Sequence, residues 1–314
     1  MRSTPFKIET VSGLQRAVEK ARLEGKRIAF IPTMGALHEG HRSLIHQAKS
    51  PPAPLFQSGV KKNYFRVVSI FVNPTQFNSA EDLQKYPRTL GQDLKLCERE
   101  GVDLVFTPTV DEIYPDGLKT NIPVPEVGLP MEGEFRPGHF AGVCAVVHRL
   151  FKIVGPCVAL FGEKDFQQVR VIEEMVREQK IPVEIVWCPT VRDKNGLALS
   201  SRNARLSPEG YQKALAIPRG IKAVQEGKGI KAAKKELANL KTDYFIIADS
   251  ETLISEPDEM RGRPPRRDAG VLGRYVEERP RRPTKQIAGY EMSSRIFIAA
   301  WVEGVRLIDN DILQ

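Results

Sequence analysis

The chain has 314 residues, 41% of them hydrophobic and 27% charged, which predicts a soluble globular protein of about two domains. Its net charge of +8 comes mostly from residues 261–285, which hold nine basic and three acidic side chains, so the rest of the chain is close to balanced. This balance argues against a broadly basic nucleic-acid-binding surface. No apolar run reaches membrane-spanning length, and the amino terminus lacks a signal-like apolar core, which argues against a membrane protein and a secreted protein.

The first half of the chain alternates helices and strands. Apolar spacing predicts helices over 12–24 and 90–100, each ended by a glycine, and a further helix leaving residue 44. Apolar and β-branched runs predict strands over 28–31, 66–72 and 103–106. The proline-rich stretch 50–64 is interpreted as a surface loop. This alternation favours an α/β protein with a parallel, doubly wound sheet.

The second half continues this alternation and then changes character. Residues 143–154 and 165–179 are predicted helices, and 157–161 and 183–187 predicted strands. After Pro189, the dipeptide Asn195-Gly196 predicts a hairpin turn, and 211–240 is helical in pattern, kinked or interrupted by Pro218. Two further strands, 244–248 and 295–301, are assigned to a small sheet. The proline- and arginine-rich segment 256–290 between them is interpreted as a mobile insertion.

The cysteines point to a reducing compartment. Their spacing contains no close pair, which predicts buried thiols and a cytoplasmic location; they are Cys97, Cys144, Cys157 and Cys188.

The first of four polar clusters is Pro32-Thr33-Met34-Gly35-Ala36-Leu37-His38-Glu39-Gly40-His41, between a predicted strand and a predicted helix. The three-residue spacing of His38 and His41 puts both imidazoles on one helix face, beside free backbone N–H groups and the positive end of the helix dipole. A phosphate-binding site is the preferred interpretation. An ordinary glycine turn is the alternative, and a zinc site is disfavoured because no third ligand cluster is visible.

The other clusters, 73–78, 162–168 and 199–203, also follow strands or turns, where open α/β sheets bind ligands. Lys164 and the run Ser200-Ser201-Arg202 could meet a triphosphate, although a solvated lysine and an exposed turn are the commoner roles of such residues. Gln76 and Gln168 suit a small hydroxylated acid because their amides both donate and accept, although most glutamines are surface residues. The roles of Arg136 and His139, in a lid or pinning a loop, stay open.

Taken together, the four clusters make the chain similar to the pantoate–β-alanine ligases of the nucleotidyltransferase superfamily. The resemblance covers most of the chain in order and is carried by residues 32–41, 69–77, 86–90, 136–140, 161–168, 196–203, 300–301 and 306–310. It implies a Rossmann-like ATP- and pantoate-binding domain over 1–188, a smaller α+β lid domain over 189–314, and a homodimer.

The resemblance also implies site residues and a reaction. The implied ATP site comprises Met34, Gly35, Ala36, Leu37, His38, Glu39, Gly40, His41, Gly162, Glu163, Lys164, Asp165, Val191, Leu199, Ser200, Ser201 and Arg202. Gln76 and Gln168 would bind pantoate, with Gln76 also near β-alanine, and His41 occupies the family's proton-donor position. Catalysis is expected from His38, His41, Lys164, Ser200, Ser201 and Arg202 with Mg²⁺, whose ligands are left unassigned.

The implied reaction activates pantoate as an adenylate, releasing pyrophosphate, and then joins it to β-alanine, releasing AMP. Segments 50–64 and 256–290 are longer than the family pattern, and Cys144 stands where a hydroxyl residue is usual. Another His-x-x-His nucleotidyltransferase is the alternative enzyme. A nucleic-acid-binding protein using 261–285 is the alternative from another class, disfavoured because Tyr275 is its only aromatic residue.

Overall fold

A computed structural model describes residues 6–51, 63–118, 121–255 and 294–313. The expected loop 50–64 and insertion 256–290 therefore lie largely outside the described residues. In the part of the chain that the structure describes, no helix is both long enough and apolar enough to cross a membrane.

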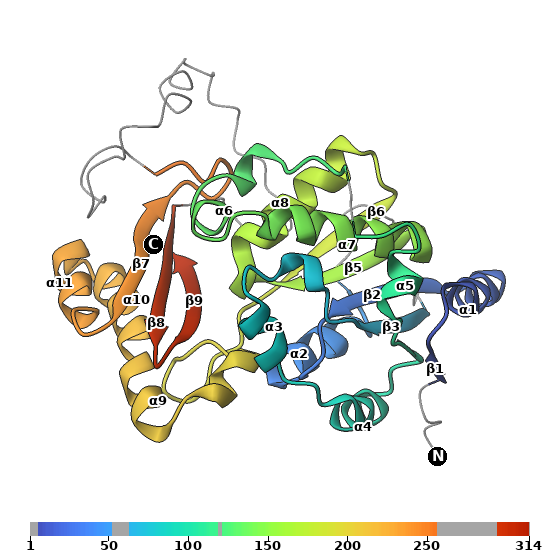
Figure 1. The fold of residues 1–314 in the computed structure, drawn as a ribbon, viewed down its shortest axis with the longest axis horizontal. Helices are drawn as coiled ribbons and strands as arrows, with labels where there is room; N and C mark the ends of the chain where they lie inside the picture. Colours follow the sequence, from blue (N-terminus) through green and yellow to red (C-terminus); the bar gives the residue numbers. More distant parts are fainter. Residues whose placement is uncertain (1–5, 52–62, 119–120, 256–293, 314) are drawn as a thin grey trace.

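The first layer is a six-stranded parallel sheet in the order β1-β4-β3-β2-β5-β6 (Figure 1). Its strands are β1 (Phe6–Ile8), β2 (Arg27–Thr33), β3 (Tyr64–Ile70), β4 (Leu104–Phe106), β5 (Cys157–Gly162) and β6 (Val183–Cys188). The chain builds outward from β2 through β3 to β4, then returns beside β2 with β5. The β2–β5 pair is therefore the point where the strand order reverses, and the predicted doubly wound sheet is confirmed.

Both faces of this sheet are covered, as the near-continuous apolar strands require. In β2, Ile28 and Phe30 pack toward α1 (Val11–Leu23), α7 (His139–Val154) and α8 (Phe166–Glu178). The alternate residues, Ala29 and Ile31, pack toward α2 (Glu39–Gln47) and α4 (Leu90–Glu100). The shorter elements of this part are η1 (Pro74–Gln76), α3 (Ala80–Lys85), α5 (Val110–Ile113), η2 (Glu126–Gly128), α6 (Glu132–Phe135) and η3 (Glu163–Asp165).

The carboxyl-terminal part forms a three-stranded antiparallel sheet, β7-β8-β9, made of β7 (Lys241–Ala248), β8 (Arg295–Val302) and β9 (Val305–Ile312). Two strands were expected, and β9 was missed. One face, with Ile296 and Ile298, packs on α9 (Pro208–Ala214), α10 (Ala216–Gln225) and α11 (Gly229–Glu236). The opposite face meets the first layer, where Phe297 contacts Phe166 of α8.

Two predicted helices differ from those observed. The helix expected at 143–154 begins at His139, since Gly138 in the left-handed region lets the chain turn into it earlier. The helical region 211–240 is three helices, and the first break falls at Leu215 rather than at Pro218. Pro218 lies in the first turn of α10, where its missing N–H removes no intrahelical hydrogen bond.

Candidate active site

The turn after β2 is held by a buried carboxylate from another helix. Asp93 of α4, 2% exposed, accepts hydrogen bonds from the backbone N–H groups of Ala36 (3.0 Å) and Leu37 (2.8 Å). Gly35 (φ 80°) and Ala36 (φ 51°) both adopt left-handed backbone, and a Cβ on Gly35 would lie 3.1 Å from the Asp93 carboxylate. A protein carboxylate therefore occupies the N–H groups of Ala36 and Leu37, so these two groups of the turn are not available to a phosphate.

The hydrogen bonds of the two histidines define their tautomers. His38 is the N-cap of α2, and its Nδ1 accepts from the backbone N–H of Gly40 at 3.1 Å. His41 Nδ1 accepts from the backbone N–H of His38 at 3.3 Å, which completes a capping box. An accepting Nδ1 carries no proton, so each neutral ring bears its proton on Nε2. The pair, with ring centroids 4.2 Å apart, therefore offers two Nε2–H donors.

The surroundings keep both rings neutral. Burial lowers the pKa of His38 to about 4, with a further contribution from the Lys164 ammonium. Burial and the neighbouring His38 lower the pKa of His41 to about 3. Both rings therefore act near neutral pH as uncharged hydrogen-bond donors.

Gln76, in the 3₁₀ helix η1 after β3, is 9% exposed and held by a polar network. The Asn73 side-chain amide donates to the Gln76 side-chain oxygen at 3.2 Å. The Gln76 amide nitrogen lies 2.8 Å from the Met34 sulfur. His139 Nδ1 lies 2.9 Å from the Gln76 backbone oxygen and Arg136 donates to that oxygen at 3.4 Å, so these two residues, whose roles were left open, hold η1 in place.

The turn after β5 carries the lysine. Lys164 Nζ lies 3.3 Å from the Asp165 carboxylate in η3. Gln168 lines the cleft from the first turn of α8. Its neighbour Gln167 faces the interior, where its amide donates to the backbone oxygens of Val127 and Pro130.

The run Ser200-Ser201-Arg202 leads into η4 (Ser201–Arg205), and α3 contacts it from across the cleft. Ser200 caps η4 by accepting from the Arg202 backbone N–H at 3.3 Å. Asp82 of α3 accepts from the Arg202 guanidinium at 3.0 Å, and the Tyr86 hydroxyl lies 3.3 Å from the Ser201 hydroxyl. Asp82 and Tyr86 were not among the site residues expected from the sequence, although Tyr86 lies in a stretch that carries the family resemblance. Only the tertiary fold brings α3 to η4.

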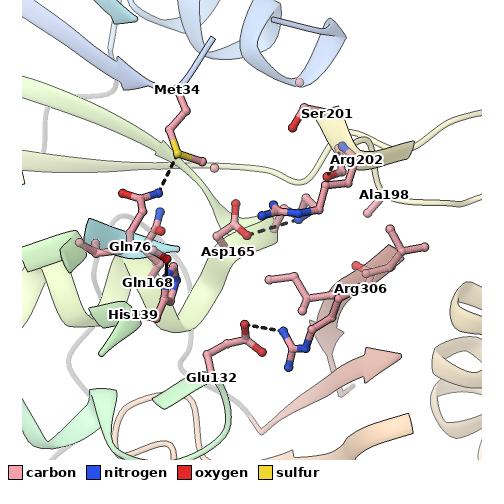
Figure 2. A pocket seen from close by; sticks show the side chains of 18 of the residues that line it. Met34, Gln76, Glu132, His139, Asp165, Gln168, Ala198, Ser201, Arg202 and Arg306 are labelled. Atoms are coloured by element: carbon pink, nitrogen blue, oxygen red, sulfur yellow. Dashed lines mark hydrogen bonds and ion pairs between the residues drawn. The ribbon is translucent and has the colours of Figure 1, made fainter. Parts of the chain in front are cut away.

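These turns line one cleft of about 660 Å³ between the two sheets. In Figure 2, Met34 and Gln76 lie on one side, Ser201 and Arg202 on the other, with Asp165 between them. Of the expected site residues, those lining it are Met34, His38, Gly40, His41, Gln76, Gly162, Lys164, Asp165, Gln168, Val191, Leu199, Ser200, Ser201 and Arg202.

Five expected site residues do not line the cleft. Gly35, Ala36 and Leu37 form the turn behind the histidines. Glu39 is exposed and pairs with Arg42 at 3.0 Å, and Glu163 lies 3.6 Å from Arg295. Within the described ranges, no group of three or more histidine, cysteine, aspartate or glutamate side chains could hold a metal ion.

A polar, nucleotide-sized cleft at the reversal point of a doubly wound sheet, lined by neutral imidazoles, a lysine and an arginine, defines an α/β protein built to bind phosphorylated ligands. The family model described as Pantoate-beta-alanine ligase matches residues 7–312. The chain belongs to this family.

Proteins and solved structures similar to this chain match it over nearly its whole length. The pantothenate synthetase of Aquifex aeolicus is 43% identical over 308 residues, covering 98% of each chain. The crystal structure of pantothenate synthetase from Thermus thermophilus is 37% identical, with a TM-score of 0.78, and covers 98% of this chain and 99% of that one. The ligase of Francisella tularensis, described as complexed with beta-gamma ATP and beta-alanine, is 32% identical with a TM-score of 0.74, and covers 98% and 97%.

Proposed function

We propose that this protein condenses pantoate with β-alanine at the expense of ATP, through a pantoyl-adenylate intermediate. The observation that carries the proposal is the convergence of four polar turns, remote in sequence, on one cleft of about 660 Å³. That volume falls within the range of about 300–1,000 Å³ typical of small-molecule sites.

The first step follows from charge. A pantoate carboxylate oxygen bonds to the α-phosphorus of ATP as the bond from that phosphorus to the bridging oxygen breaks, releasing pyrophosphate. Negative charge grows on the departing phosphates, so fixed donors facing them lower the barrier. The Nε2–H groups of His38 and His41, the Lys164 ammonium and the Arg202 guanidinium supply such donors in our proposal, together with the Ser201 hydroxyl.

Pantoate lies between Gln76 and Gln168 in this proposal. Both amides line the cleft, and the polar network around Gln76 fixes the position of η1. An uncharged amide can bind the pantoate hydroxyls and leave the carboxylate free to attack.

In the second step the β-alanine amine attacks the acyl carbon. The new C–N bond forms, the bond from carbon to the AMP oxygen breaks, and the amine loses a proton. We assign no side chain among the described residues lining the cleft as the base. In our proposal, positioning of the amine against the acyl carbon in a closed site accelerates this step.

Mg²⁺ is proposed to enter with ATP. Magnesium usually keeps several waters and is held by substrate phosphates plus one or two carboxylates. The cleft fits this mode, because Asp165 presents a carboxylate beside Lys164 and the described chain builds no larger ligand cluster. When bound, the ion would neutralise phosphate charge.

We also propose that residues 1–188 form the ATP- and pantoate-binding domain and 189–314 a lid, that the enzyme is a homodimer, and that it acts in the cytoplasm. Support for the division into two domains is that the two sheets bury separate apolar clusters.

Support for a reducing location is that all four cysteines are free and buried. Sedimentation at several protein concentrations tests the dimer.

The decisive experiment incubates the protein with ATP, (R)-pantoate and β-alanine and follows AMP, pyrophosphate and pantothenate. Equal amounts of AMP and pantothenate are expected. A dinucleotide-like ester formed from a phosphorylated alcohol would instead favour another His-x-x-His nucleotidyltransferase.

A further inference from the structure

Strand β9 places two adjacent polar residues, Asp309 and Asn310, beneath two different segments of the proposed ATP site. Each is only 3% exposed. They lie about halfway along the third strand of the small sheet, paired with Ile298 and Phe297 of β8. The pairing of β9 with β8 therefore fixes the backbone that carries both side chains.

Asn310 holds the turn that carries the lysine. Its side-chain nitrogen donates to the backbone oxygens of Glu163 (2.9 Å) and Lys164 (2.8 Å), both in η3. Its side-chain oxygen accepts from Arg295, whose guanidinium lies over the Phe166 ring. An amide nitrogen has two hydrogens, and both are committed to this one turn.

Asp309 holds the hairpin that leads into the serine loop. Its carboxylate accepts two hydrogen bonds from the Arg192 guanidinium, at 2.6 and 3.0 Å. Arg192 also donates to the Gly196 backbone oxygen across the hairpin and to the Asn310 backbone oxygen, both at 3.1 Å. The hairpin, closed by a bridge from Arg192 to Ala198, continues directly into Leu199–Arg202.

We propose that Asp309 and Asn310 form a positioning pair that fixes the Lys164 turn and the Ser200–Arg202 loop relative to each other. The inference rests on the proposed function, in which both segments bind one departing pyrophosphate. Misplacement of such groups by about 1 Å can cost about 100-fold in rate. Because the two residues are neighbours on β9, a single strand sets both positions.

The test variant is Asn310→Asp, which keeps the shape and the oxygen facing Arg295 but replaces both donors with an oxygen opposed to two carbonyls. We expect pantoate-dependent exchange of pyrophosphate into ATP to fall by about 30- to 100-fold in kcat, with the KM for pantoate changed less than about threefold. Amide formation from preformed pantoyl adenylate should fall by less than about threefold.

The matched control is Gln225→Ala. Gln225 of α10 donates its side-chain amide to the Ile312 backbone oxygen at 2.9 Å, so it supports the same strand two residues away without touching η3. Its loss should leave pyrophosphate exchange within about twofold of the wild type.

A double-mutant cycle separates positioning of Lys164 from general support of the fold. In a Lys164→Ala background, Asn310→Asp should cost less than about threefold further, because the group it positions is already gone. If Asn310→Asp does not fold, as judged by circular dichroism, Asn310→Ala takes its place in the cycle, since it removes the donors without adding a repelling oxygen.

Losses that multiply in the double variant, or equal losses in both half-reactions, overturn the positioning role, as does a Gln225→Ala variant impaired as much as Asn310→Asp. A wild-type protein that forms neither AMP nor pantothenate overturns the proposed function itself, and the inference with it. Wild-type turnover is measured first, so the two failures are distinguishable.

Discussion

At the scale of single residues, the chemistry of the cleft depends on which nitrogen of each imidazole carries the proton. The capping box between His38 and His41 uses both Nδ1 atoms as acceptors, so Nε2–H is the available donor on each ring. A ring with its pKa near 3 or 4 is a poor source of a whole proton at neutral pH. We therefore infer that His41 acts by hydrogen bonding in the proposed first step.

His41→Asn tests this role. The asparagine oxygen can still accept from the His38 N–H at the Nδ1 position, whereas the donor at the Nε2 position is lost. Adenylate formation should fall by about 100- to 1,000-fold, as when one donor to a developing charge is removed. Pre-steady-state release of pyrophosphate measures the effect. A variant with near-normal release and an unchanged melting temperature would contradict it.

The same pKa shifts predict how stability depends on pH. Burial lowers the pKa of His38 and of His139 to about 4 and that of His41 to about 3. The neighbouring His38 adds to the shift of His41, and Arg136 adds to that of His139. The unfolded chain therefore binds protons near pH 6.5 that the folded chain does not, so stability falls as pH drops through that value. Between about pH 7 and pH 5 each ring should cost about 1–2 kcal/mol.

Urea unfolding at these two pH values measures the loss, and both values lie above the ordinary pKa of aspartate and glutamate. His41→Asn should show a smaller loss than the wild type, by its own share of about 1–2 kcal/mol. Equal stability of the wild type at both pH values would refute the assignment.

At the scale of elements, the site depends on how closely α7 approaches η1. A Cβ added to Gly142 of α7 would lie 2.4 Å from the Thr75 backbone oxygen and 2.7 Å from the Gln76 backbone nitrogen. The Gly142 backbone oxygen also accepts from Asn73 at 3.0 Å. A glycine is therefore required where the helix supports the turn that carries Gln76.

Gly142→Ala should displace η1, because the atoms that the added Cβ would meet are backbone atoms of Thr75 and Gln76, which cannot shift without moving the turn. We expect a loss of about 1–3 kcal/mol in unfolding free energy, as for other overpacked sites, and a KM for pantoate raised by about tenfold. Steady-state kinetics and urea unfolding measure both.

The matched control is Gly91→Ala in α4, where an added Cβ meets nothing within 4 Å. Alanine there should leave the KM for pantoate unchanged and stabilise the helix by up to about 1 kcal/mol. Similar kinetic effects in both variants would show that the approach of α7 to η1 does not set the position of Gln76.

At the scale of the whole molecule, a buried charge cluster joins helix α6 to the three-stranded sheet. Glu132 of α6 accepts from Arg306 of β9 at 2.7 Å and from the Tyr244 hydroxyl of β7 at 2.7 Å (Figure 2 shows the Glu132–Arg306 pair). Burial acts to raise the pKa of Glu132, but the hydrogen bond and the charge of Arg306 lower this pKa to about 2. Arg306 also donates to Asp243 at 2.7 Å.

Glu132→Gln should destabilise the protein by about 3 kcal/mol or more at neutral pH, because it leaves a buried guanidinium with less compensation. Urea unfolding measures this loss. The control Glu24→Gln, on the surface beside Lys26, should change stability by less than about 0.5 kcal/mol. An equal effect of the two substitutions would mean that the cluster does not hold α6 on the three-stranded sheet.

Strands β2 to β6 and the polar residue types that line the cleft are local properties, and the sequence by itself predicted them. The strong apolar runs of β2, β3 and β5 predicted strands, and Gly101 ended α4 where expected. Polar clusters directly after those strands predicted where a ligand site would form, because parallel strands bring their carboxyl ends to one edge.

What only the tertiary structure decided was which remote groups support that site. No local pattern reveals the partners of Asp93, Asp82 and Asn310, since a single aspartate on a helix or an asparagine on a strand is ordinary in sequence. Their partners lie 57, 120 and 146 positions away along the chain. Periodicity reports the face of an element, whereas the partner of a buried polar group is fixed only when packing brings the elements together.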